Sequence, residues 1–537
     1  MFPTFLHPFL PQKKLFKAYD IRGDVTLFTD DFVWALARSF AKLFGNANNG
    51  DVVIGYDVRL HSAGIAQFLA YACHQAGLQV HWLGQVTTPI MAFMANEYTG
   101  NGLMVTASHS EKHINGIKWL VNGESPSSQD IQDLFECLAD EAVILPDEAL
   151  LATITHHASQ LTTTDTQAYF TQYQSAIYQA IDTINQQRQP LTHHSNSHDC
   201  TVATPQLLVI DCMNGATSHY AKGLFEGLGY TCVMLNEQAD GTFPKGNPDP
   251  TEVGRLDELC QAVLDYQGDM GLAFDGDGDR LMVVNRLGQV VSPDHLLYLL
   301  AKVALMELPP QHLAHTPMPF SNHQITPSLL PKAEVIFDVK CSHHIPNLIG
   351  QQGAIPVMEK TGSSLMRKSL QNKSRFSVFA GELSGHFLFN DGYFVLHDDA
   401  MYAGVRLLNW LQYQPQDLVT LLESLPQGVS TADMYLAVEN AEAGQKIISN
   451  IVSISKRPFR AIKRSFAIKN INTIDGLRLD FAHGFGIVRK SNTGNFLTVR
   501  FSANTLKDLR QIQGVFVDLC RSVDKELAQQ VAQIQPV

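Results

Sequence analysis

Short apolar runs alternate with longer segments of helical periodicity through most of the chain, and this alternation restricts the possible folds more than any other feature. The apolar run at residues 52–55 precedes a helical pattern at 62–76, and the run at 207–210 precedes another at 220–228. Strands that are buried on both faces and connected by helices are typical of parallel sheets covered by helical layers. The sequence therefore predicts an α/β fold.

The size and charge of the chain narrow the class of protein. A chain of 537 residues that is 45% hydrophobic exceeds what one core accommodates, so we expect several domains. The net charge of −13 disfavours a broad attraction to nucleic acid or to an anionic membrane. The eight cysteines lack metal-site spacing, and we find neither a signal peptide nor an apolar stretch of membrane-spanning length. We expect a cytoplasmic protein with reduced thiols that binds neither nucleic acid nor membrane.

An acidic loop follows the apolar run 270–274, where residues 275–280 read Asp-Gly-Asp-Gly-Asp-Arg. Carboxylates at alternate positions can converge on one cation while the glycines let the backbone curve, and Mg²⁺ prefers such oxygen ligands. The candidate ligands are Asp275, Asp277 and Asp279. The sequence therefore predicts a catalytic metal site at the end of a strand.

The alternative interpretations of this loop are a simple turn or a calcium loop of the EF-hand type. An EF-hand needs a glutamate at its twelfth position, but counting from Asp275 gives Arg286. A strand rather than a helix also precedes the loop. Arg280, directly after the carboxylates, can offset their charge or hold a phosphate.

A candidate nucleophile, Ser108, follows the apolar run 103–105. His109 is its neighbour and Lys118 comes ten residues later, so a hydroxyl, an imidazole and a cation lie close in sequence. No G-x-S-x-G elbow surrounds this serine, which argues against a serine hydrolase. A metal site together with a nucleophilic serine indicates phosphoryl transfer.

Two further segments carry groups that recognise sugars and phosphates. Residues 381–386 read Gly-Glu-Leu-Ser-Gly-His, and their carboxylate, hydroxyl and imidazole suit sugar hydroxyls, although an ordinary β-turn is the alternative. Residues 489–495 read Arg-Lys-Ser-Asn-Thr-Gly-Asn, which is a plausible phosphate cradle or, alternatively, a polar hairpin turn. Arg22, in the segment 17–23, can add a guanidinium to the same pocket.

The last hundred or so residues differ in pattern from the rest. Strand-like pieces occur at 434–438 and 496–501, and a helical pattern occurs at 506–517. We expect a smaller α+β domain to close the chain.

With these motifs in this order, the chain resembles the α-D-phosphohexomutases, most closely the bacterial phosphomannomutase/phosphoglucomutase branch. The resemblance covers nearly the whole chain and implies an α/β fold with three related α/β domains with mixed sheets plus a C-terminal α+β domain, heart-shaped around a central cleft. The implied domains are 1–178 with the phosphoserine loop, 179–292 with the metal-binding loop and a polar insertion at 186–206, 293–427 with the sugar-binding loop, and 428–537 with the phosphate-binding loop.

The resemblance also implies a role for each candidate residue. Ser108 would carry the phosphoryl group and complete a Mg²⁺ site with Asp275, Asp277 and Asp279. The implied catalytic residues are Ser108, His109, Lys118 and Arg22, without an assignment of the general base. The implied substrate contacts are Tyr19, Arg280, Lys340, Glu382, Ser384, His386, Arg489, Ser491, Asn492 and Thr493.

The reaction that the resemblance implies is reversible phosphoryl transfer between C6 and C1 of mannose and glucose phosphates. It would pass through a hexose 1,6-bisphosphate, with glucose 1,6-bisphosphate as activator, and would feed nucleotide-sugar and surface polysaccharide synthesis. One phosphoserine cannot reach both ends of a bound hexose, so the bisphosphate must turn end over end. We expect a monomer whose partners are hexose phosphates.

Some residues depart from the family pattern. Ser110-Glu111 replace an Asn-Pro pair, which would alter only the stiffness of the serine loop, and Ser363 replaces a histidine that meets substrate. The loss of that histidine could change affinity or sugar preference. The polar insertion carries several histidines that could bind metal, but such segments are usually solvated linkers.

Three alternative functions remain compatible with the sequence. The first is a phosphoglucosamine mutase, although Leu383 differs from the residue expected there. The second is a metal-dependent sugar-phosphate phosphatase, and the third is a sugar-phosphate-binding protein without catalysis.

Overall fold

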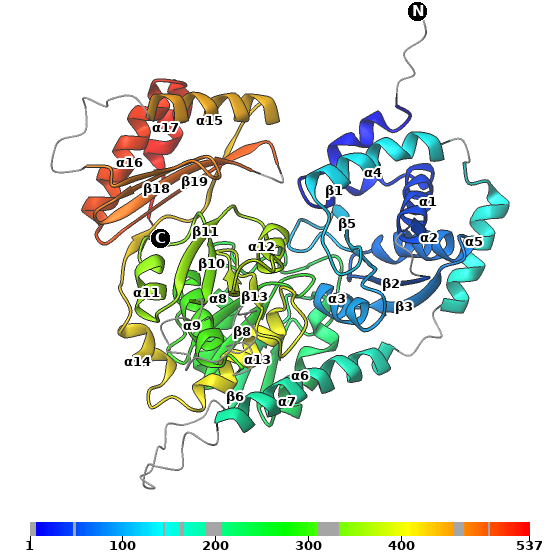
Figure 1. The fold of residues 1–537 in the computed structure, drawn as a ribbon, viewed down its shortest axis with the longest axis horizontal. Coiled ribbons are helices and arrows are strands. Elements are labelled where there is room, and N and C mark those ends of the chain that lie inside the picture. Colours follow the sequence, from blue (N-terminus) through cyan, green and yellow to red (C-terminus); the bar gives the residue numbers. More distant parts are fainter. Residues whose placement is uncertain are drawn as a thin grey trace, which may run out of the picture. The chain divides into compact units, whose positions relative to one another are not determined.

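The computed structural model describes residues 7–46, 50–142, 145–161, 166–188, 206–309, 332–455, 467–491 and 494–536. The chain forms two compact units, coloured by sequence in Figure 1. The first unit comprises Met1–Val291, Glu307–Ala314 and Ser384–Asp417. The second unit comprises Ser292–Met306, His315–Leu383 and Leu418–Val537.

The first unit begins with a mixed sheet of strand order β1-β5-β4-β2-β3. Its strands are β1 (Ile21–Asp24), β2 (Asp51–Tyr56), β3 (Gln79–Gln85), β4 (Gly102–Val105) and β5 (Ile114–Leu120). Strands β2, β3 and β4 are parallel, whereas β5 is antiparallel to both β4 and β1. The accompanying helices are η1 (Leu10–Leu15), η2 (Val25–Leu27), α1 (Asp30–Asn46), α2 (Ser62–Gln75), α3 (Thr88–Glu97), α4 (Ser128–Glu141), α5 (Glu148–Leu161) and α6 (Thr166–Arg188).

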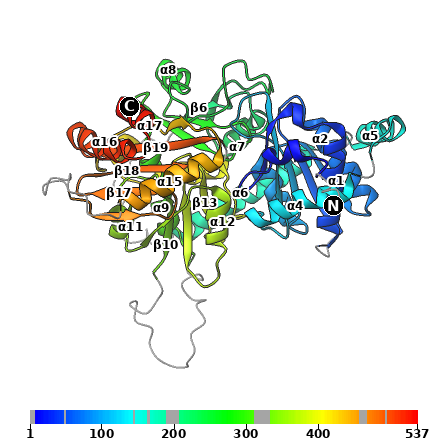
Figure 2. The ribbon, with the colours of Figure 1, turned by 90° about the horizontal axis from the view of Figure 1, so that it is seen from above.

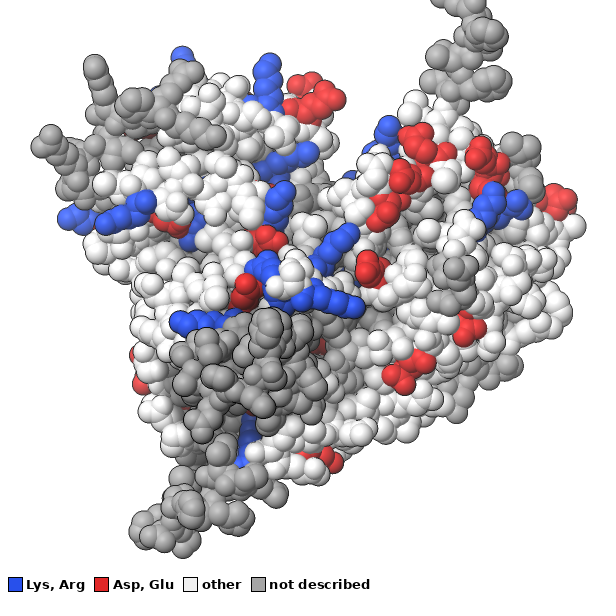
Figure 3. All heavy atoms as spheres, in the orientation of Figure 1, with Lys and Arg blue, Asp and Glu red and all other residues white. Residues whose placement is uncertain are grey.

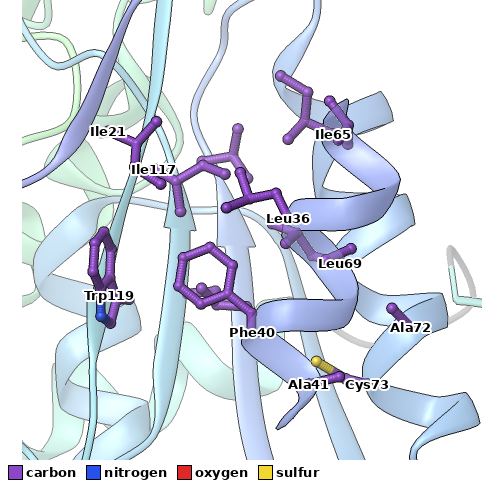
Figure 4. Close-up of a cluster of buried hydrophobic side chains, with 14 of the residues drawn as sticks. Ile21, Leu36, Phe40, Ala41, Ile65, Leu69, Ala72, Cys73, Ile117 and Trp119 are labelled. Carbon is purple, nitrogen blue, oxygen red and sulfur yellow. The ribbon is translucent and has the colours of Figure 1, made fainter. Parts of the chain in front are cut away.

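Helices α1 and α2 supply the apolar core against this sheet. Their apolar residues recur at helical spacing, so each helix presents one buried stripe. Figure 4 shows Leu36 and Phe40 of α1 and Leu69 of α2 facing Ile117 and Trp119 of β5. The ring of Phe40 meets that of Trp119 edge to face, with centroids 5.1 Å apart.

A second mixed sheet in the first unit has the order β7-β6-β8-β9. Strands β6 and β8 are parallel, and β8 and β9 form an antiparallel hairpin. The elements of this layer are β6 (Leu207–Asp211), η4 (Ala216–His219), α7 (Ala221–Gly227), β7 (Thr231–Leu235), α8 (Asp257–Asp265), β8 (Met270–Phe274) and β9 (Leu281–Asn285). The first unit also contains β13 (Phe387–Phe389), which is not a strand of this sheet, and α13 (Ala400–Leu411). Helix α13 packs against β8 and β9, although more than a hundred residues separate them.

The second unit contains a parallel α/β layer and a largely antiparallel C-terminal sheet. In the first of these, β10 pairs in parallel with both β11 and β12. The elements of that layer are α9 (Pro293–Met306), β10 (Glu334–Asp338), α11 (Ile345–Gln351), β11 (Ile355–Glu359), α12 (Ser363–Leu370), β12 (Ser377–Gly381) and α14 (Leu418–Glu423).

The C-terminal sheet has the order β14-β19-β18-β17-β16, with β15 also paired to β19. Figure 2 shows α15 and α16 beside its strands. Its elements are β14 (Val429–Ser430), β15 (Met434–Ala437), α15 (Ala441–Ser455), β16 (Asn470–Asn472), β17 (Leu477–Phe481), β18 (Gly484–Lys490), β19 (Phe496–Ala503), α16 (Leu506–Arg521) and α17 (Lys525–Gln533). The apolar stripe of α16 covers β18 and β19.

The observed elements confirm the predicted α/β layers with mixed sheets and the C-terminal α+β domain. The expected boundary at 178/179 falls inside α6, and most of the polar insertion (189–205) lies outside the described residues. Among the helices described, none combines the length and apolar character that crossing a membrane requires. On the face drawn in Figure 3, acidic side chains predominate over the N-terminal α/β layers, in keeping with the negative net charge.

The core of the first unit generates a test of stability. We expect Leu69→Ala to lower the free energy of unfolding of the first unit by about 2–5 kcal/mol, because it leaves a cavity at a fully buried position. The matched change Leu60→Ala, at a side chain that is 71% exposed, should alter it by less than about 0.5 kcal/mol. Urea unfolding followed by tryptophan fluorescence measures both, because all four tryptophans lie in the first unit. Equal effects of the two changes would contradict this account of the core.

A histidine pair generates a test of pH dependence in the second unit. Burial, the adjacent His344 and Arg478 lower the pKa of His343 from 6.5 to about 4, although Asn504 accepts a hydrogen bond from its Nε2 and Asp480 opposes the shift. Between pH 6.5 and about 4, His343 is protonated in the unfolded chain but not in the folded chain. The stability of the second unit should therefore fall as pH drops from 6.5 towards 4.

Hydrogen exchange followed by mass spectrometry of peptides from β17 and β18 measures this change. His343→Gln should flatten the pH dependence between 6.5 and 4, because it removes the titrating group. An unchanged profile would assign the effect to other groups.

Candidate functional site

Ser108 lies on the turn that connects β4 to β5, and its side chain points at the acidic loop. Its backbone adopts the left-handed conformation with φ of 52°, and only 2% of the residue is exposed. Its N–H donates to Oγ1 of Thr106 at 2.8 Å, and its own Oγ donates to Oδ2 of Asp275 at 2.7 Å. The predicted nucleophile and the predicted metal loop therefore meet, although 167 residues separate them.

The acidic loop is the turn of the β8–β9 hairpin. Oδ1 of Asp275 accepts hydrogen bonds from the N–H groups of Gly278, Asp279 and Arg280, at 3.0, 3.0 and 3.2 Å. Gly276 allows the close approach of the serine loop, since a Cβ there would lie 2.5 Å from the carbonyl oxygen of Ser108. The glycines thus let three carboxylates converge, as the sequence pattern predicted.

Lys118 extends from β5 to this carboxylate cluster. Its Nζ donates to Oδ2 of Asp277 and to Oδ2 of Asp279, both at 2.7 Å. Burial alone would lower the pKa of Lys118, but the two carboxylates raise it above its usual value. Thr88 also donates to Oδ2 of Asp277, at 2.5 Å. Lys118 is therefore a fixed cation in the site.

The three carboxylates can hold a metal ion. One oxygen from each of Asp275, Asp277 and Asp279 lies within 4.8 Å of the others, and all three residues are buried. Among the described residues, Oδ1 of Asp277 and Oδ1 of Asp279 have no hydrogen-bond partner. Burial, together with the neighbouring Asp279 and Asp277, raises the pKa of Asp275 well above its usual value. A divalent cation would satisfy these oxygens and offset the repulsion, so the residues fit such an ion.

His109 lies beside the acidic loop and contacts the ion pair that Asp249 forms with Arg280. Its Nδ1 contacts Oδ2 of Asp249 at 2.8 Å, and Nη1 of Arg280 lies 3.6 Å from the same oxygen. Burial and Arg280 lower the pKa of His109 to about 4, against the influence of Asp249. Burial alone would raise the pKa of Asp249, but His109 and Arg280 hold it well below its usual value. His109 is therefore a neutral imidazole with a defined orientation.

His386 also lies next to the acidic loop. Its Nδ1 is 3.0 Å from Oδ2 of Asp398 and 3.6 Å from Oδ1 of Asp279, and Nε of Arg280 donates to its Nε2 at 3.1 Å. Burial lowers the pKa of His386, but Asp279 and Asp398 raise it to about 9 overall.

Arg22 and Tyr19 lie at the start of the first sheet. Nη2 of Arg22 donates to Oδ2 of Asp20 at 2.6 Å, and its Nη1 donates to Oγ of Ser110 at 3.3 Å. Ser110, one of the departures from the family pattern, thus ties Arg22 to the serine loop. Tyr19 is partly buried against the core of the same domain.

Lys340 and Glu382 belong to the second unit, whereas Ser384 and His386 belong to the first. Nζ of Lys340 donates to Oδ2 of Asp433 at 2.6 Å. Burial alone would lower the pKa of Lys340, but Asp433 and Asp338 raise it above its usual value. Glu382 accepts a hydrogen bond from the backbone N–H of Gly362.

Arg489 lies near the end of β18 rather than in the following turn. Its Nε donates to Oδ2 of Asp475 at 2.7 Å, and that oxygen also accepts from the N–H of Thr361 at 3.3 Å. Ser491 is buried and its Oγ accepts a hydrogen bond from the N–H of Gly494. The predicted contacts Asn492 and Thr493 lie outside the described residues.

Comparison with known proteins now identifies the family. Residues 13–142, 180–288 and 292–429 match the phosphoglucomutase/phosphomannomutase alpha/beta/alpha domains I, II and III, respectively. The chain belongs to the phosphoglucomutase/phosphomannomutase family. This confirms the resemblance that the motifs indicated.

Individual members of the family align over nearly the whole chain. A phosphomannomutase/phosphoglucomutase from Pseudomonas syringae pv. tomato is 33% identical and covers 96% of each chain. A phosphoglucomutase from Neisseria meningitidis is 31% identical and covers 94% of this chain and 96% of its own. The crystal structure of a phosphoglucomutase/phosphomannomutase family protein from Burkholderia thailandensis superimposes with a TM-score of 0.73 at 28% identity, covering 97% of this chain and 99% of the other.

Sequence reasoning missed several polar residues that complete the site of this family member. Asp249 and Asp398 orient the two histidines, and Asp57 and Arg59 hold the serine loop. Asp57 and Arg59 directly follow β2, so their place after a strand was the signal that could have indicated them. Asp249 and Asp398 lie in loops without such a signal.

The acidic cluster generates a test by metal binding. Substitutions of residues next to metal ligands typically weaken metal binding about 10- to 100-fold. We expect Asp277→Asn to weaken Mn²⁺ binding by at least this factor, because it removes the charge of a proposed ligand. Asp265→Asn, at the exposed end of α8, serves as the matched control and should leave affinity unchanged. Titration followed by electron paramagnetic resonance of free Mn²⁺ measures both. Unaltered binding in the Asp277 variant would exclude this residue as a ligand.

Proposed function

We propose that this protein catalyses reversible phosphoryl transfer between C6 and C1 of mannose and glucose phosphates. The observation that carries the proposal is the 2.7 Å hydrogen bond from Ser108 Oγ to Asp275, within a cluster of three buried carboxylates. A hydroxyl directed at a cation-binding cluster suits phosphoryl transfer, which depends on positioning and on stabilising charge. The names of relatives that align over nearly the whole chain support the same reaction.

In the proposed reaction, Ser108 carries the phosphoryl group that is exchanged with the sugar. The bond between Ser108 Oγ and phosphorus breaks as a hexose hydroxyl oxygen bonds to the phosphorus, and the serine regains a phosphoryl group from the bisphosphate. Asp275, Asp277 and Asp279 would hold Mg²⁺ together with an oxygen of the phosphorylated Ser108. The ion would supply positive charge to the phosphoryl oxygens. Glucose 1,6-bisphosphate would prime Ser108.

The charged and neutral groups around Ser108 have different roles in the proposed reaction. Lys118 stays protonated between two carboxylates, so it suits charge stabilisation better than proton uptake. His109 donates from Nδ1 to Asp249, which leaves the lone pair of Nε2 to accept the proton of the attacking hydroxyl. Arg22 and Arg280 add guanidinium groups for phosphoryl oxygens.

The remaining candidates bind the part of the substrate that does not react. We assign the sugar hydroxyls to Glu382, Ser384 and His386, and the distal phosphate to the segment from Arg489 to Thr493. Tyr19 and Lys340 are assigned as further substrate contacts. Because the bisphosphate must turn between the two transfers, the same cradle has to accept either of its phosphates.

Replacing the nucleophile tests the proposal. After incubation with glucose 1,6-bisphosphate, the parent protein should gain about 80 Da, one phosphoryl group, on Ser108. Ser108→Ala should lose this adduct and multiple turnover while still binding glucose 1-phosphate. Intact-mass measurement and a coupled isomerisation assay record the two outcomes. Multiple turnover by the alanine variant would refute the proposed mechanism.

The same assay distinguishes the alternative functions. Release of free phosphate without isomerisation would indicate a phosphatase, and a preference for glucosamine phosphates would indicate a phosphoglucosamine mutase. Parallel kinetics with mannose 1-phosphate and glucose 1-phosphate would define the sugar preference.

A further inference from the structure

Arg59 gathers the backbone carbonyl oxygens of the serine loop around one buried guanidinium. Its Nη2 donates to the carbonyl oxygens of Ser108 at 2.7 Å and Ser110 at 2.6 Å. Its Nη1 donates to those of Glu111 at 2.7 Å and Ile114 at 2.9 Å. The side chain is 1% exposed. One planar group thus binds the carbonyl oxygens of Ser108 and of three residues that follow it on the way to β5.

Asp57 fixes Arg59 and is itself tied to the same turn. Its carboxylate accepts from the N–H of Arg59 at 3.0 Å, from Nε of Arg59 at 3.2 Å and from Oγ of Ser62 at 2.6 Å. It also accepts from Oγ1 of Thr106 at 2.7 Å, and Thr106 Oγ1 in turn accepts the N–H of Ser108 at 2.8 Å. The N–H of Ser108 is therefore linked to Asp57 through Thr106, while the carbonyl oxygen of Ser108 is bound by Arg59.

The hydrogen bonds of Asp57 and Arg59, called here the Asp57–Arg59 network, hold a residue whose backbone conformation is strained. A non-glycine residue at positive φ is strained, and this conformation persists only where the surroundings hold it. Ser108 has a φ of 52°. The Asp57–Arg59 network binds its carbonyl oxygen directly and its N–H through Thr106. Its Oγ is not part of this network and contacts Asp275.

We propose that Arg59, oriented by Asp57, is a positioning residue that holds Ser108 in the left-handed conformation and so directs its phosphoryl group to the acidic cluster. The inference rests on the proposed function. A relaxed turn would move Oγ relative to Asp275, and a displacement of about 1 Å can cost about 100-fold in rate.

Lysine cannot replace this arginine. An ammonium is a point charge with three donors, whereas the guanidinium has five donors in a fixed plane and here contacts five oxygen atoms through its side chain. Arg59→Lys keeps the charge but loses the geometry, and Arg59→Gln loses both. Arg38, on α1, pairs with Glu141 outside the site, so Arg38→Gln is the matched control.

The experiment compares these variants in three measurements. We expect kcat for isomerisation to fall about 100-fold in both Arg59 variants, while KM for glucose 1-phosphate and the thermal midpoint of Arg59→Lys stay close to the parent values. The single-turnover rate of Ser108 phosphorylation by glucose 1,6-bisphosphate, followed by intact mass, should fall in parallel with kcat. Arg38→Gln should leave kcat and the phosphorylation rate unchanged.

The contrary outcomes are distinct. Arg59 variants with the parent kcat and phosphorylation rate would overturn the inference while leaving the proposed function standing. If Arg59→Lys does not fold, or if kcat, KM and the thermal midpoint decline together, Arg59 is a folding residue and the inference is wrong. A parent protein that neither isomerises hexose phosphates nor takes up a phosphoryl group would refute the proposed function itself.

Discussion

The repulsion between three buried carboxylates is the constraint on which the site depends. Asp275, Asp277 and Asp279 are each no more than 1% exposed and converge within one ion's reach. Like charges in such surroundings are costly unless cations face them. Lys118 contacts Asp277 and Asp279, and Nε of Arg280 lies 3.8 Å from Oδ2 of Asp275, so two side-chain cations face three carboxylates. The cluster thus has a strong demand for further positive charge. The hairpin glycines and the left-handed turn at Ser108 bring the proposed nucleophile to the place where that charge would be bound.

Buried arginines hold the functional loops in both units in the same way. Arg59 binds carbonyl oxygens of the serine loop in the first unit. In the second unit, Arg478 donates to the carbonyl oxygens of Val339 and Cys341, both at 2.7 Å, and Arg500 donates to that of Lys340 at 2.8 Å. A guanidinium suits this task because its donors diverge in one plane and its charge is weakly hydrated. In each unit the loop carries a candidate side chain, Ser108 or Lys340, that must keep one orientation.

The sequence predicted those parts of the structure that short-range patterns control. The strand at 270–274 and the acidic turn after it follow from an apolar run and from alternating aspartates and glycines, and the structure has both. The partners of the two histidines were not predictable in this way. Asp249 lies 140 residues from His109, and nothing in its local pattern indicates that it faces an imidazole. Such contacts depend on how whole layers pack, which periodicity does not encode.

In both units the cations assigned to the substrate are already paired with carboxylates, and this pairing bears on how a substrate could be released. In the first unit, Arg22 is paired with Asp20 and Arg280 with Asp249. In the second unit, Arg489 is paired with Asp475 and Lys340 with Asp433. A phosphate that binds these cations competes with carboxylates already in place, so part of the gain in binding is offset by the ion pairs that it displaces. A cradle without such competitors would bind the bisphosphate more tightly and would slow its turn between the two transfers. Moderate affinity is therefore what the proposed reaction requires of these cations, because the bisphosphate has to leave them in order to turn.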